Sequence, residues 1–158
     1  MTDLPYHTLL SADQQRAAGI ETPAPYAMAD KVRFGEIDML GHVNNAAYLS
    51  WFETVRTRYV KDYGLTGYNP GHDPRIVIRS AEIHYIREML RDEDYIVTAR
   101  TTAFRTTSFT IEQNLWSATL RARFSCVIVT LEPNGSAKRA LPEGFVNKIK
   151  KTDGASPH

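Results

Sequence analysis

This sequence of 158 residues shows no pattern that predicts an internal disulfide, a membrane-spanning helix or a secretory signal. Its one cysteine, Cys126, has no partner for an internal disulfide and lies in an apolar, strand-like run. No apolar run approaches the roughly 18 residues that a membrane-spanning helix needs. The first residues also lack a basic segment followed by an apolar one, the pattern of a secretory signal. We therefore expect a cytoplasmic protein without a membrane partner, in which Cys126 is a small buried hydrophobe.

A strong charge of either sign is also missing. The 19 lysines and arginines nearly balance the 18 aspartates and glutamates, which gives a formal net charge of +1. Proteins that bind nucleic acids are usually basic, so we expect no nucleic-acid partner. A local basic patch for a phosphorylated ligand stays open.

Motifs for a metal ion, a nucleotide or a serine nucleophile are absent as well. The sequence contains no GxSxG, GxxxxGK[ST] or GxGxxG. No two histidines form an HxH or HxxxH pair, so we expect no metal ion. The histidines are His7, His42, His72, His84 and His158.

The chain has the length of one domain, with atypical segments at both ends. In residues 1–29, Ser11 is a suitable N-cap for a short helix that Gly19 ends, and two prolines then predict an extended connector. Residues 30–147 have the patterning of a globular domain, and 42% of all residues are hydrophobic. We expect the polar tail, 148–158, to be disordered.

Within the domain, one long helix separates a short strand from four longer ones. The short strand is predicted at 31–35 and the helix at 45–63. Aromatic and apolar residues recur there with helical spacing, at Tyr48, Phe52, Val55, Tyr59 and Tyr63. Alternating or β-branched runs predict strands at 75–86, 94–104, 108–116 and 119–131. This order predicts an α+β fold, an antiparallel sheet of about five strands curled around one helix, with edges that favour a homo-oligomer.

Polar residues crowd the entry to the helix, in the segment FGEIDMLGHVNNAAYLSWFE (34–53). Asp38 precedes the predicted helix start at Asn45, and Gly41 lets the chain turn sharply between them. The free N–H groups and positive dipole end of a helix can hold a carbonyl oxygen that becomes an oxyanion. A nearby carboxylate can activate water or attack the carbonyl itself. These parts are sufficient for acyl transfer to water.

Each residue of this cluster also has a purely structural interpretation, which the sequence leaves open. The alternatives are a turn cap for Asp38, a hydrogen-bonded loop position for His42, helix caps for Asn44 and Asn45, and a solvated acid or an ion pair with Arg56 or Arg58 for Glu53.

The segment VRFGEIDMLGHVNNAAYLSWFETVR resembles the acyl-CoA thioesterase family of the hotdog fold, in its 4-hydroxybenzoyl-CoA thioesterase-like branch. The shared pattern is an acid, two residues, GHVNN, an aromatic residue near the helix start, and a helix that bears an acid and an arginine. The resemblance extends more loosely over residues 30–145. The matching residues are Asp38, Gly41, His42, Val43, Asn44, Asn45, Tyr48, Glu53 and Arg56.

The resemblance implies a hydrolase that cleaves acyl-CoA thioesters without a cofactor. An acyl carrier protein in place of CoA stays open as the carrier of the acyl group. Asp38 would be general base or nucleophile, and the Asn45 N–H would hold the oxyanion. His42 and Asn44 would shape the turn and contact the thioester, while Gly41, Tyr48 and Glu53 complete the candidate substrate site. The family's assemblies imply a homodimer or homotetramer with its active sites at the subunit interface.

Other assignments stay open on the sequence alone. Hotdog proteins include hydratases and dehydratases that pair a histidine with an acid, here His42 and Glu53, and a non-catalytic acyl-CoA-binding module is a third function. The extension at 1–29 would cover the acyl pocket or add to an oligomer contact. Candidates for contact with CoA phosphates are Arg87, Arg91, Arg105 and Arg139.

Overall fold

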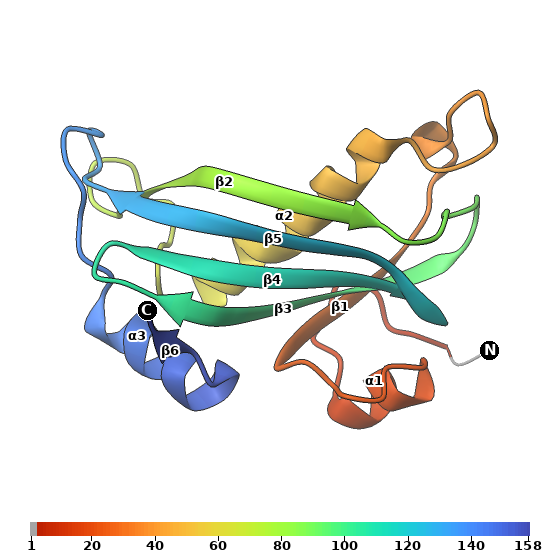
Figure 1. Cartoon of the computed structure of the whole chain (residues 1–158), viewed down its shortest axis with the longest axis horizontal. Coiled ribbons are helices and arrows are strands. Elements are labelled where there is room, and N and C mark those ends of the chain that lie inside the picture. The colour runs from red at the N-terminus through yellow and green to blue at the C-terminus, as the bar shows by residue number, and fades with distance from the viewer. Residues whose placement is uncertain (1–2) are drawn as a thin grey trace. The chain divides into compact units, whose positions relative to one another are not determined.

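The computed structural model describes residues 3–158, which contain a six-stranded sheet with the main strands in the order β1-β3-β4-β5-β2 (Figure 1). The strands are β1 (Tyr26–Lys31), β2 (Arg75–Tyr85), β3 (Asp94–Phe104), β4 (Ser108–Ser117), β5 (Thr119–Leu131) and β6 (Ser156–Pro157). The helices are α1 (Ala12–Ala17), the 3₁₀ turn η1 (Phe34–Glu36), α2 (Asn45–Asp62), α3 (Glu143–Lys148) and the π-helical turn η2 (Ile149–Asp153).

The long helix and the four longer strands lie where the sequence predicts them, within one residue at each end. The short first strand was misplaced, because the prediction put it at 31–35. The structure has β1 at Tyr26–Lys31, paired antiparallel with β3 from Tyr26 opposite Ala99 to Lys31 opposite Asp94. Residues 34–36 instead form a 3₁₀ turn, which is closed when the Glu36 side chain accepts a hydrogen bond from the Arg33 N–H at 2.9 Å.

The described chain divides into two compact units, and the boundary between them falls within α2, after Arg56. The first unit joins the residues up to Arg56 with Ile83–Ala99 and Gln113–Phe124. The second joins Thr57–Glu82, Arg100–Glu112 and Ser125–His158.

In the first unit, the start of α2 packs on one face of the sheet through aromatic rings. The Trp51 ring stacks on Tyr95 of β3 with 4.2 Å between ring centroids. The Phe52 ring stacks on Phe124 of β5 at 5.0 Å, and both side chains are buried. Offset stacking adds about 0.5–1.5 kcal/mol to what burial of the rings contributes. These contacts fix the part of α2 that follows the polar cluster.

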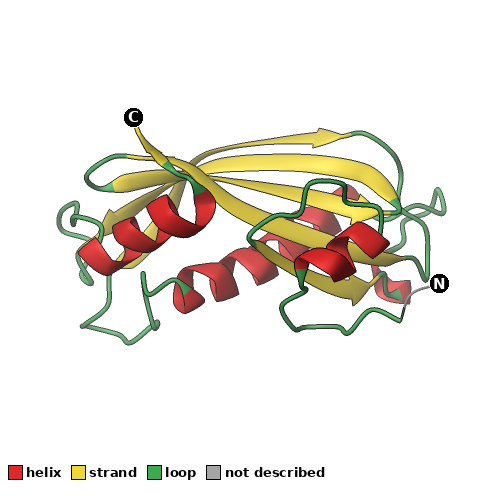
Figure 2. Ribbon diagram, turned by 90° about the horizontal axis from the view of Figure 1, so that it is seen from below, coloured by secondary structure: helices red, strands yellow, loops and turns green. Residues whose placement is uncertain are grey.

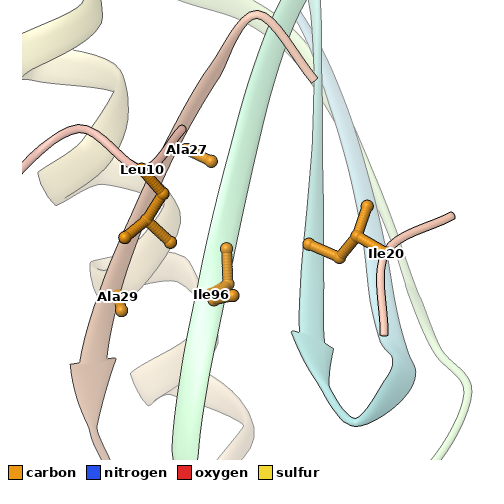
Figure 3. Packing of buried hydrophobic residues seen from close by; sticks show 5 residues of the cluster. All are labelled: Leu10, Ile20, Ala27, Ala29 and Ile96. Atoms are coloured by element: carbon orange, nitrogen blue, oxygen red, sulfur yellow. The ribbon is translucent and has the colours of Figure 1, made fainter. Parts of the chain in front are cut away.

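The opposite face of β3 in this unit is covered by the N-terminal extension. Ile96 points away from its neighbour Tyr95 and packs in an apolar cluster with the extension (Figure 3). Figure 2 shows α1 between the two loops of this extension. As predicted, Ser11 caps α1, here in a capping box with Gln14. The cluster consists of Leu10, Ile20, Ala27, Ala29 and Ile96.

In the second unit, the C-terminal residues are ordered, which corrects the predicted disordered tail. The buried carboxylate of Asp153 accepts hydrogen bonds from the hydroxyls of Tyr59 and Tyr63, the latter at 2.6 Å. The Thr101 N–H donates to the same carboxylate at 2.8 Å, and Ser156 pairs with Ala103 of β3. Because the tail's partners come from distant segments, its own polar sequence gives no sign of this order. The predicted boundaries between extension, domain and tail stay predictions.

The two edges of the sheet differ in how they are protected. Backbone hydrogen bonds from the extension cover β1, where the Leu10 N–H donates to the Ala27 carbonyl at 3.0 Å. β2 pairs with β5 alone in the described chain, and most of its eleven residues are exposed. Val77 and Ile78 are among its exposed apolar side chains. An edge strand of this length with exposed apolar side chains is able to pair with another chain.

Candidate functional site

Asp38 closes a tight turn just before α2. Its backbone N–H donates to the His42 carbonyl at 2.8 Å, and its carboxylate Oδ1 accepts a hydrogen bond from the Leu40 N–H at 2.8 Å. Gly41 has a φ of +83°, a conformation that glycine adopts without strain. The other carboxylate oxygen, Oδ2, has no hydrogen-bond partner within residues 3–158, and the side chain is exposed. Asp38 therefore caps a turn and also presents one free carboxylate oxygen.

Asn44 is the N-cap of α2. Of the two adjacent asparagines that the sequence offered for this position, Asn45 is instead the first residue of the helix. The Asn44 side-chain Oδ1 accepts a hydrogen bond from the Ala46 N–H at 2.9 Å, and the Asn44 carbonyl accepts one from the Ala47 N–H at 2.9 Å. The Asn45 N–H has no acceptor in the part of the chain that the structure describes. This N–H lies at the positive end of the helix dipole and is available to an outside acceptor.

The turn and the helix start are held by two neighbouring segments. The Val43 N–H donates to the carbonyl of buried Met89 at 2.8 Å, in the loop between β2 and β3. His42 Nε2 lies 2.9 Å from a carboxylate oxygen of Glu88 in the same loop. In η1, the Glu36 carbonyl accepts a hydrogen bond from the Asn44 N–H at 2.7 Å. His42 is thus engaged as a hydrogen-bonded loop residue.

Two tyrosines stand beside the first turn of α2. The buried Tyr48 ring meets the Tyr85 ring edge-on at 5.0 Å between centroids. The Tyr85 hydroxyl donates to the Asn45 carbonyl at 3.2 Å. Burial raises the pKa of Tyr48 above its ordinary value, while a hydrogen bond with the Met89 backbone acts in the opposite direction. Tyr85 is not among the site residues predicted from the sequence. Its only signal there is that it is an aromatic residue near the end of a predicted strand.

Glu53 is not joined to this cluster within the described chain. Its side chain is 69% exposed, and its nearest charged partner is Arg56, at 3.8 Å. Arg56 is buried, donates to Gln113 Oε1 at 3.1 Å and lies 5.5 Å from the centre of the Phe124 ring. Glu53 follows Asn45 by eight residues, about 12 Å along the helix axis. Since His42 pairs with Glu88, the histidine–acid pair of a hydratase is not assembled by His42 and Glu53 within one chain.

Large apolar side chains are exposed around the turn in the first unit. Phe34, Met39 and Leu40 on the segment that holds Asp38 are all more than three-quarters exposed. Soluble proteins rarely leave such side chains together in water unless another molecule covers them. Further exposed apolar side chains of this unit are Leu49, Ile86 and Leu90.

Three cavities of the described chain do not have Asp38 in their linings. One of about 440 Å³ lies in the first unit, between the N-terminal extension and residues 91–96 and 116–118. In the second unit, adjoining cavities of about 270 and 640 Å³ share Arg105 and His158 in their linings. Arg79 also lines the smaller one, and neither cavity has an acidic residue in its lining. These two cavities of the second unit are thus lined by arginine side chains and by the C-terminal residue.

Two other predicted phosphate contacts, Arg139 and Arg91, do not line the two cavities of the second unit. Arg139 donates to the His72 carbonyl at 3.1 Å. Arg91 pairs with Asp92 at 3.4 Å and lies over the Phe34 ring. Among the described residues, no group of three or more His, Cys, Asp and Glu side chains is arranged to hold a metal ion. No helix in the same residues is long and apolar enough to cross a bilayer.

Residues 32–149 match the sequence profile of the thioesterase-like superfamily. The protein YsmA of Bacillus subtilis (strain 168), itself uncharacterized, is 32% identical over 80 residues. This match covers 51% of the present chain and 53% of YsmA, so it spans about half the length of that relative.

Two crystal structures resemble the chain over most of its length. A thioesterase superfamily protein from Jannaschia sp. CCS1 is 40% identical, with a TM-score of 0.90 over 96% of this chain and 97% of that one. A thioesterase from Thermus thermophilus, complexed with coenzyme A and Zn, is 31% identical, with a TM-score of 0.72 over 83% of this chain and 96% of that one. The predicted α+β hotdog fold is confirmed by these similarities.

Proposed function

Because the chain belongs to the thioesterase-like superfamily, we propose that it hydrolyses acyl-CoA thioesters to a free acid and CoA. The observation that carries the proposal is the pairing of two free groups on one short segment. One carboxylate oxygen of Asp38 has no hydrogen-bond partner in the described chain. The backbone N–H of Asn45 likewise has no acceptor there. A general base and an oxyanion donor are the two groups that this reaction needs.

In the proposed reaction, the thioester carbonyl accepts a hydrogen bond from the Asn45 N–H. Asp38 removes a proton from water, and the water oxygen attacks the carbonyl carbon. The helix dipole of α2 stabilises the oxyanion that forms. Collapse of the tetrahedral intermediate breaks the C–S bond, and the proton on Asp38 passes to the departing thiolate. If Asp38 attacks directly, an acyl-enzyme forms first and water then hydrolyses it.

His42, Gly41 and Asn44 have a supporting role in this proposal. Gly41 supplies the left-handed backbone of the turn, and Asn44 caps the helix, so that the Asn45 N–H keeps its position. His42 is tied to Glu88 at 2.9 Å and orients the turn rather than exchanging protons. Tyr48 contributes an apolar wall, while Glu53 faces solvent unless a partner chain meets it.

We further propose that two copies of the chain complete the site. The exposed strand β2 is available for pairing with a second β2, which would extend the sheet across two chains. The exposed Phe34, Met39 and Leu40 would then lie against the partner or the acyl group. A dimer built in this way, or a tetramer made of two such dimers, agrees with the interface location of active sites in the resembling family.

CoA is the proposed carrier of the acyl group. The Thermus thermophilus relative was crystallised with coenzyme A, which supports the assignment by similarity. An acyl carrier protein stays an alternative carrier. The cytoplasmic location also stays a prediction, which rests on a single cysteine that is buried.

A direct test is release of free thiol from a panel of short, long, aromatic and enoyl acyl-CoAs by the full chain. Hydrolysis of any member supports the proposal and identifies the acyl class. Hydration of the enoyl-CoA without thiol release would replace the proposal with a hydratase. Tight binding of acyl-CoA without either reaction would replace it with a binding module.

A further inference from the structure

Arg121 of β5 binds the loop between β2 and β3 at several points. Its Nη1 donates to the Glu88 carbonyl at 2.6 Å, and its Nη1 and Nη2 form two hydrogen bonds to the Glu93 carboxylate, at 3.2 and 3.0 Å. Its Nε donates to the Ser117 carbonyl at 3.1 Å, and its own carbonyl accepts the N–H groups of Ile86 and Arg87. The Arg121 side chain is only 12% exposed. A bidentate, charge-assisted pair of this kind stabilises the fold and also fixes the orientation of the two side chains relative to each other.

Glu93 extends the same network into the loop and to the next segment. Its Oε2 accepts a hydrogen bond from the Leu90 N–H at 2.8 Å, which closes the loop on itself. Its carbonyl accepts a hydrogen bond from the Val32 N–H at 2.9 Å. Val32 is buried and lies just before η1, so Glu93 holds the entry to the segment that contains Asp38.

The exit of that segment is held by residues that Arg121 touches. Met89, whose sulfur lies 3.5 Å from Arg121 Nη1, accepts the Val43 N–H through its carbonyl at 2.8 Å. Glu88, whose carbonyl accepts a hydrogen bond from Arg121, binds His42 through its carboxylate. The Arg121–Glu93 pair therefore fixes both ends of residues 32–43. Asp38 lies between these two anchors, and Asn45 follows two residues after the second.

We infer that Arg121, clamped to Glu93, is a positioning residue that sets the Asp38 carboxylate against the Asn45 N–H. The inference rests on the proposed function, because it gives that site its geometry. Arg121 itself does not touch substrate; it acts through Glu88, Met89 and Glu93. A misplacement of reacting groups by about 1 Å can lower turnover by about 100-fold. A lysine cannot replace the forked guanidinium of Arg121. Its single ammonium group cannot bind the Glu88 carbonyl and both carboxylate oxygens of Glu93 together.

The test compares Arg121→Ala and Arg121→Lys with the matched control Arg123→Ala. Arg123 lies two residues further along β5, is exposed and has no hydrogen bond or ion pair to another described residue. We expect both Arg121 variants to lose about 10- to 100-fold in kcat with KM changed only a few-fold, at a temperature where they remain folded. Millimolar ethylguanidinium should restore part of the kcat of Arg121→Ala, and Arg123→Ala should match the wild type.

A second readout does not depend on activity. Backbone hydrogen exchange should accelerate at Val43 and Asn44 in Arg121→Ala, while the amide of Val97 in β3 stays protected. Unchanged kcat and unchanged exchange at Val43 in Arg121→Ala, whatever its melting temperature, would overturn the inference. If the wild type hydrolyses no acyl-CoA, the proposed function fails, and the exchange rates alone still decide whether Arg121 positions the turn.

Discussion

The indole nitrogen of Trp51 donates a hydrogen bond to Glu36 Oε1 at 2.9 Å, joining α2 to the 3₁₀ turn that leads to Asp38. The other oxygen of the same carboxylate closes that turn by accepting the Arg33 N–H. The Trp51 ring also stacks on Tyr95, so one side chain ties the sheet, the helix and the turn together. The helix start and the turn with Asp38 are thus braced from two sides, by η1 and by the loop between β2 and β3.

Trp51→Phe should weaken this brace without removing the aromatic packing. The phenyl ring can still lie against Tyr95, but the hydrogen bond to Glu36 is lost. We expect a loss of about 1 kcal/mol in the free energy of unfolding, measured by urea denaturation. We also expect a several-fold lower kcat. A Trp51→Phe variant as stable as wild type would contradict the role of this bond.

Asn44→Ala should destabilise the start of α2. It removes the side-chain acceptor of the Ala46 N–H and should lower the free energy of unfolding by about 1 kcal/mol. Asn44→Asp keeps an N-cap acceptor and should restore that stability in thermal unfolding. Equal melting temperatures for the alanine and aspartate variants would show that the cap is not needed.

The buried tyrosines predict a loss of stability in alkali. Burial raises the pKa of Tyr95 well above its ordinary 10.0, so the folded state disfavours its ionised form. Above pH 10 the unfolded chain releases this proton and the folded chain keeps it, so the free energy of unfolding falls as pH rises. Urea midpoints measured from neutral pH to above pH 10 should show this decline, with a smaller slope in Tyr95→Phe. A Tyr95→Phe slope equal to that of wild type would count against the raised pKa.

The long helix and the longer strands could be predicted because their apolar residues recur with a clear period. The first strand was misplaced by a few residues, since YAMADK follows two prolines and has no strong alternation. The order of the C-terminal tail was missed for a different reason. Asp153 is a polar residue in a polar stretch, and only tertiary contacts with Tyr59 and Tyr63 reveal it as buried.

The local residues of the candidate site could be predicted from the sequence, but the contacts that hold them in place could not. Asp38, Gly41 and Asn45 could be named because the turn and helix start lie within a few residues of each other. Tyr85, Glu88 and Arg121 could not, because they reach the turn from strands and loops distant in sequence. Whether Glu53 belongs to the site stays a prediction that depends on a partner chain.

The central claim is that Asp38 not only caps a turn but also uses its free carboxylate oxygen as the base or nucleophile in thioester hydrolysis. The most direct measurement is kcat of Asp38→Asn on the best acyl-CoA, beside Asp73→Asn. Asp73 is a suitable control because it also accepts backbone N–H groups in a turn, from Gly67 and Asn69. We predict that Asp38→Asn loses at least about 100-fold in kcat with its oligomer intact, while Asp73→Asn stays near the wild type. Turnover by Asp38→Asn equal to that of Asp73→Asn would contradict the account.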